Sequence, residues 1–76
     1  VYPNPARDRV EVKLENVPQG ERFRIKLWNI SGQCLMEEEM RGGNMALSLE
    51  NLGGGIYFLV AESENSRLST RLIVQK

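Results

Sequence analysis

Short segments in which apolar and polar residues alternate are the feature of this chain that most limits its fold. Apolar side chains at every second position indicate strands with one buried face, because successive residues of a strand point to opposite sides of a sheet. Turn signals separate the segments. No segment keeps the helical period of about 3.6 residues over three turns. The sequence therefore predicts an all-β fold.

Six strands can be placed from their apolar residues. The first residues of the sequence, Val1 and Tyr2, could add a seventh. The six are Val10, Val12 and Leu14; Phe23, Ile25 and Leu27; Cys34 to Met36; Met45, Leu47 and Leu49; Ile56 to Glu62; and Arg67 to Lys76 with Leu68, Thr70, Leu72 and Val74 on one face. Short strands at this spacing favour an immunoglobulin-like antiparallel β-sandwich of six to seven strands.

The connections carry the residues that tight turns require. Turns are predicted at Val17 to Gly20, Asn29 to Gly32, Arg41 to Asn44, Gly53 to Gly55, and Glu64 to Ser66. Asn29 supplies a side-chain acceptor and Gly32 a backbone free to take a positive φ, as a hairpin needs. The Gly53 to Gly55 run is expected to let the strands on either side join different sheets. The apolar run that follows it, Ile56 to Glu62, is of a kind that could be buried on both faces.

Charge and composition exclude several functional classes. Ten basic residues balance ten acidic ones, so the chain offers no general attraction for nucleic acid. The absence of His and the single cysteine, Cys34, leave neither common zinc sites nor most nucleophile–base pairs. We therefore expect no metal site, no cofactor and no enzymatic activity. Cys34 is expected to be a small hydrophobe, buried or half-buried. Glu37 to Glu39 should form either a solvated strand end or a charged edge that discourages pairing between sheets.

The aromatic residues leave two interpretations open. Trp28, Tyr57 and Phe58 could form a platform on which sugars stack, but in so small a sandwich they are more simply core residues. No apolar run approaches the ~18 residues that a membrane-spanning segment needs.

Four segments in order resemble the type A C-terminal sorting domain of the type IX (Por) secretion system. The opening Tyr2-Pro3-Asn4-Pro5 is similar to the family's first element. Leu27 to Gln33 is similar to its apolar strand and Gly-containing turn. The most specific element is matched by Leu49, Leu52, Gly55, Tyr57, Leu59 and Val60, and the basic tail by Arg71 to Lys76.

The resemblance implies a secretion signal that carries no chemistry of its own. The expected partners are the outer-membrane translocon, a surface sortase that removes the domain, and a covalently linked upstream cargo, with transit through the periplasm to the cell surface. Recognition by the translocon is expected at Arg71, Leu72, Val74, Lys76, Gly55 and Tyr57. The junction and turn residues are Tyr2, Pro3, Asn4, Pro5, Asn29 and Gly32. Lys76 and the terminal carboxylate are expected to have little packing role.

Domain organisation follows from the same resemblance. Residues 1–76 are expected to be a single sorting domain cut from a longer secreted precursor. The alternative is an accessory β-sandwich that binds carbohydrate or acts as a spacer in a secreted enzyme or adhesin.

Overall fold

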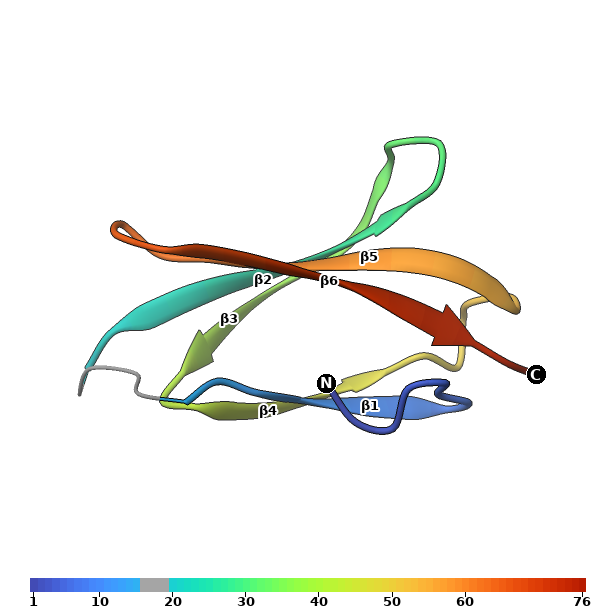
Figure 1. Ribbon diagram of the computed structural model, residues 1–76, viewed down its shortest axis with the longest axis horizontal. Helices are drawn as coiled ribbons and strands as arrows, with labels where there is room; N and C mark the ends of the chain where they lie inside the picture. The colour runs from blue at the N-terminus through green and yellow to red at the C-terminus, as the bar shows by residue number, and fades with distance from the viewer. Residues whose placement is uncertain (16–19) are drawn as a thin grey trace.

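Two antiparallel β-sheets pack face to face in the computed structural model, which describes residues 1–15 and 20–76 (Figure 1). The strands are β1 (Arg9–Lys13), β2 (Arg22–Asn29), β3 (Cys34–Arg41), β4 (Asn44–Ser48), β5 (Gly55–Glu62) and β6 (Arg67–Val74). The described residues form no helix. The predicted all-β sandwich is confirmed. The turn predicted at Val17 to Gly20 lies mostly outside the described residues.

The two sheets differ in size. The small sheet pairs β1 with β4, and the large sheet has the strand order β3-β2-β5-β6. The chain changes from one sheet to the other between β4 and β5, where the run Gly53 to Gly55 lies, as the sequence predicted. One face of each sheet is buried against the other, and both outer faces meet solvent.

The core forms between the two inner faces from side chains at alternate strand positions. The small sheet contributes Val10, Val12 and Leu47, and the large sheet contributes Phe23, Ile25, Leu27, Met40, Leu59 and Leu72, all buried. Burying one such aliphatic or aromatic side chain is worth roughly 1.5–3 kcal/mol. Burial of these alternate apolar side chains is therefore what drives the two sheets together.

The segment before β1 joins both sheets without forming a strand. Tyr2 makes an isolated antiparallel bridge to Glu11 of β1, and Ala6 makes an isolated parallel bridge to Val74 of β6. The seventh strand suggested at Val1 and Tyr2 is thus reduced to a single bridged residue.

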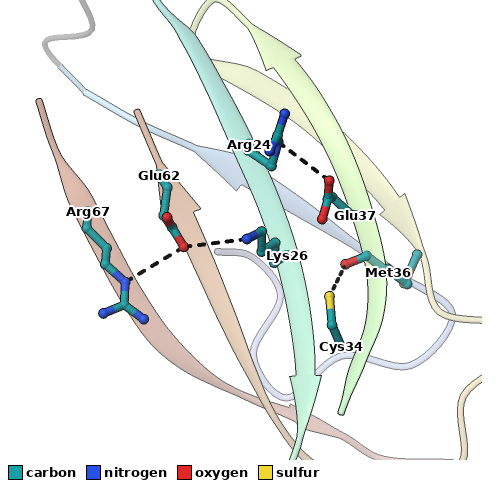
Figure 2. A network of polar contacts seen from close by, with 7 residues as sticks. All are labelled: Arg24, Lys26, Cys34, Met36, Glu37, Glu62 and Arg67. Atoms are coloured by element: carbon teal, nitrogen blue, oxygen red, sulfur yellow. Dashed lines mark hydrogen bonds and ion pairs between the residues drawn. The ribbon is translucent and has the colours of Figure 1, made fainter. Parts of the chain in front are cut away.

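Charged side chains of both signs cover one end of the outer face of the large sheet (Figure 2). Arg24 of β2 lies 3.5 Å from Glu37 of β3, and Glu62 of β5 lies 3.9 Å from both Lys26 and Arg67. The arginine side chains are largely exposed and Lys26 is half-buried, and solvent-screened pairs of this kind are worth no more than about 1 kcal/mol each. Glu37 to Glu39 lie within β3, an edge strand of the sheet, which is the second of the two positions predicted for them.

Three predictions about burial are wrong, all because solvent reaches surfaces that the sequence pattern assigned to the interior. Cys34 is exposed and donates from Sγ to the Met36 carbonyl at 3.4 Å (Figure 2). In β5 only Leu59 to Ala61 form a stretch buried on both faces, and Ile56 and Phe58 are exposed. In β6, the side chains of Leu68, Thr70, Leu72 and Val74 share one face as predicted, but only Leu72 and Val74 are buried.

Candidate recognition site

The hairpin turn between β2 and β3 is built around the Asn29 side chain. Its Oδ1 accepts from the backbone N–H groups of Ser31 at 3.0 Å and Gln33 at 2.9 Å. The Gly32 N–H donates to the Asn29 carbonyl at 3.1 Å, and Gly32 has φ +87°, which L side chains rarely adopt. The predicted pair of turn residues is therefore placed together, in a structural role.

Gly55 and Tyr57 shape the entry into β5. Gly55 has φ +155°, where a side chain would be strained. The Tyr57 ring is buried, and its hydroxyl donates to the Gly53 carbonyl at 2.8 Å. The ring thus fixes the glycine-rich connection that carries the chain from the small sheet to the large one. Both residues maintain the fold, and neither presents a side chain for a partner.

The predicted recognition residues of β6 separate by the face on which they lie. Leu72 and Val74 point inward and are 0% and 2% exposed. Arg71 directly precedes Leu72, so it points to the opposite, outer face, where it is exposed. Of the three side chains, only that of Arg71 can meet a partner of the folded domain.

The backbone edge of β6 near its end is occupied by the junction segment. The Asn4 side chain acts like a strand residue: its Nδ2 donates to the Arg71 carbonyl at 2.9 Å, and its Oδ1 accepts from the Ile73 N–H at 3.1 Å. Ala6 continues the pairing, donating to the Ile73 carbonyl and accepting from the Gln75 N–H, each at 2.8 Å. The backbone edge of β6 is therefore paired from Arg71 to Gln75.

The remaining junction residues flank this contact. Tyr2 exchanges two backbone hydrogen bonds with Glu11 of β1, at 2.9 and 2.7 Å. Pro3 and Pro5 are exposed on either side of Asn4, and the peptide bonds before them are cis.

Lys76 contributes to the fold, contrary to the prediction that it has little packing role. Its Nζ donates to the Leu49 carbonyl at 2.7 Å and to the Glu50 carbonyl at 3.2 Å. These carbonyls follow β4, so the lysine ties the end of the large sheet to the small sheet. The sequence could not show this contact because 26 positions separate the two segments.

Sequence reasoning missed a group of apolar side chains around Arg71 on the outer face of the large sheet. Phe58 lies in register with Trp28 of β2 on one side and with Arg71 of β6 on the other. Ile56 lies in register with Ile73. Phe58 and Ile56 are 42% and 45% exposed, and Trp28 and Ile73 are half-buried. We call Trp28, Ile56, Phe58, Arg71 and Ile73 the outer patch.

The signal for this patch was present in the chain. Once Tyr57 and Leu59 are assigned to the inner face, alternation places Ile56 and Phe58 on the outer one. Tyr57 therefore lies on the opposite face from Phe58 and Trp28, and the three aromatic rings form neither a common sugar platform nor a common core cluster.

In the part of the chain that the structure describes, no three His, Cys, Asp or Glu side chains gather as metal ligands would. The same part contains no helix with the length and apolar character needed to cross a membrane.

Comparison with known proteins identifies the family of this chain and two proteins to which it is similar. A family model described as "Secretion system C-terminal sorting domain" matches residues 1–75. Beta-agarase A of Zobellia galactanivorans is 33% identical over 75 residues, which is 99% of this chain and 13% of that protein. Ulvan lyase NLR42 of Nonlabens ulvanivorans is 26% identical over 76 residues, 97% of this chain and 14% of that protein. The chain thus spans about a seventh of the length of these relatives, and its match to the family model covers both sheets and all six strands. It belongs to the family of secretion system C-terminal sorting domains.

Proposed function

We propose that this domain directs an upstream cargo from the periplasm through the outer-membrane translocon of a type IX secretion system, and that a surface sortase then removes it. Family membership supports the sorting role, and the greater length of the two relatives supports attachment to a larger protein. The domain acts as a substrate of the sortase and has no catalytic role of its own. Residues 1–76 form the sorting domain of a longer precursor, whose destination is the cell surface or the medium.

The outer patch is the surface that we propose the translocon recognises. It combines exposed aromatic and aliphatic side chains with one arginine, the composition typical of the centre of protein interfaces. The exposed Arg71 beside Phe58 is the observation that carries the proposal. The other end of the same face carries the ion pairs of Figure 2, so charge and apolar surface are segregated along the sheet.

Recognition through side chains fits the structure better than strand pairing at the end of β6. A partner strand would have to displace Asn4 and Ala6 from the backbone groups of Arg71, Ile73 and Gln75. Leu72, Val74, Gly55 and Tyr57 then act indirectly, because their burial or backbone conformation holds β5 and β6 in place.

A reporter fusion tests the sorting function. The domain is fused to the C-terminus of a periplasmic reporter in a host that has the secretion system. We expect the reporter at the cell surface or in the medium, and in the periplasm when the host lacks the translocon. An intact, folded fusion that stays in the periplasm of the competent host would count against the proposal.

Charge reversal at Arg71 tests the recognition surface. In the same fusion, Arg71→Glu should lower export about tenfold or more, as the loss of an interface arginine typically does. The melting temperature of the domain should change little, because Asn4 binds the Arg71 carbonyl and not its side chain. Arg41→Glu is the matched control, since Arg41 is exposed on the other edge strand of the same sheet. Equal export by both variants would place recognition elsewhere on the sandwich.

A further inference from the structure

The inner face of β6 carries an apolar surface near the start of the strand, and the described residues leave this surface open. Leu68 is in register with Ala61, which is buried, so alternation places it on the core side of the sheet. It is nevertheless 53% exposed. The small sheet has two strands against the four of the large sheet, and the end of β1 is separated from the first half of β6 by a cleft. The sequence pattern assigns Leu68 to a core, and the residues that the structure describes, 1–15 and 20–76, do not complete that core.

A cleft of about 180 Å³ marks the open place, lined by Val1, Val12, Leu14, Leu59, Leu68 and neighbouring residues. An apolar cavity of about 150 Å³ can hold a benzene ring, so this cleft has room for one large aliphatic or aromatic side chain. It lies between the first half of β6 and the edge of β1, and Val1 stands at its border.

The hydrogen bonds of Tyr2 show which strand would cover the cleft. Tyr2 and Glu11 exchange both backbone bonds, so they form a hydrogen-bonded antiparallel pair. On the other edge of this strand, the Leu14 N–H donates to the Gly43 carbonyl. Because successive residues of a strand point their backbone groups to alternate edges, Glu11 and Lys13 point theirs to the edge that pairs with Tyr2. In this register Val1 lies opposite Val12, and both line the cleft.

Continuing the register upstream fixes the positions that precede Val1. The residue directly before Val1 comes opposite Lys13 and exchanges hydrogen bonds with it. The second residue before Val1 comes opposite Leu14, and its side chain points to the same face as Val1 and Val12. That face is the cleft.

We propose that the residues directly before Val1 in the precursor form a strand antiparallel to β1, and that the second of them is apolar and fills the cleft over Leu14 and Leu68. This rests on the proposed attachment of an upstream cargo, because the strand belongs to the linker that joins the cargo to the domain. The linker is then part of the sandwich. Cleavage upstream of this strand removes the cargo and leaves the cleft filled, whereas cleavage inside the strand opens the cleft.

Cross-strand disulfides in the full precursor test the register. In a Cys34→Ser background, Leu14→Cys is combined with a cysteine at the second position before Val1, and disulfide formation under mild oxidation is measured. The matched control combines Leu14→Cys with a cysteine at the position directly before Val1, whose side chain points to the other face. We expect a several-fold higher disulfide yield in the first variant, because opposed residues on one face meet the distance that a disulfide needs.

Equal yields, or no disulfide in either folded variant, would overturn the proposal. Amide exchange in the unmodified precursor gives a second measurement that does not depend on these variants: the Lys13 N–H should exchange many-fold more slowly than in the released domain, and equal rates would also overturn it. Export is measured separately. If the disulfide forms but export fails, the proposed strand stands and the sorting proposal is rejected. If export occurs but no disulfide forms, the sorting proposal stands and the proposed strand is rejected.

Discussion

Single residues at the margins of the sandwich carry contacts that join its two sheets. Lys76 reaches from beyond β6 to the carbonyls of Leu49 and Glu50, and Asn4 presents its amide group to β6 as if it were backbone. A charged donor that bonds two carbonyls stabilises more than a solvated side chain does. Residues that resemble free handles in the sequence are therefore part of the fold.

Lys76→Ala should lower the free energy of unfolding by about 1 kcal/mol, because both hydrogen bonds from Nζ are lost. Urea denaturation followed by circular dichroism measures the change. Gln75→Ala is the matched control, since Gln75 is exposed and its backbone bond to Ala6 is kept. If the two variants are equally stable, the lysine contacts contribute nothing, and a loss of export in a Lys76 variant would then report recognition alone.

At the scale of the element, β6 is one strand with two different halves. Its second half has buried Leu72 and Val74 on the inner face and paired backbone on its outer edge. In its first half, Leu68 faces inward but is 53% exposed, at the cleft that the end of β1 borders. The same alternating pattern thus gives core in one half and open surface in the other.

Matched truncations on β6 test this division. In the isolated domain, Leu72→Ala should cost about 2–5 kcal/mol, because it leaves a cavity in a fully buried site. Leu68→Ala should cost less than about 1 kcal/mol, because the side chain is more than half exposed. Chemical denaturation of both variants gives the two values. Similar losses would show that both halves of β6 are buried.

The whole molecule joins a four-stranded sheet to a two-stranded one through one apolar core. Paired strands such as β1 with β4 and β2 with β5 are distant in sequence, and the residues that the structure describes form one core cluster. A domain of this size has an expected stability of roughly 0.05–0.15 kcal/mol per residue, so loss of one large core side chain is a sizeable fraction of the total. The sheets should therefore unfold together.

The domain of residues 1–76 should melt as a monomer in one cooperative transition. Far-ultraviolet circular dichroism should show a β spectrum, and the melting temperature should not vary with protein concentration. The physical reason is that both sheets share the core around Ile25 and Leu27. Two separate transitions, or a helical spectrum, would contradict the two-sheet architecture.

Local sequence patterns by themselves determined the six strands, inward residues such as Ile25 and Leu47, the hairpin at Asn29 to Gly32 and the crossing at Gly53 to Gly55. These features depend on local backbone geometry and on a period of two, which the sequence displays directly. The ordered motifs also identified the family that the comparison then confirmed.

Only the tertiary structure decided how many strands cover each face. Alternation shows that Leu68 and Phe58 lie on opposite faces of the large sheet, but burial depends on whether a second layer reaches that position. Asn4 pairs with Arg71 of β6, which is 67 positions away. Lys76 binds Glu50, just after β4, which is 26 positions away. Such contacts follow from how the two sheets stack, and no local pattern encodes them.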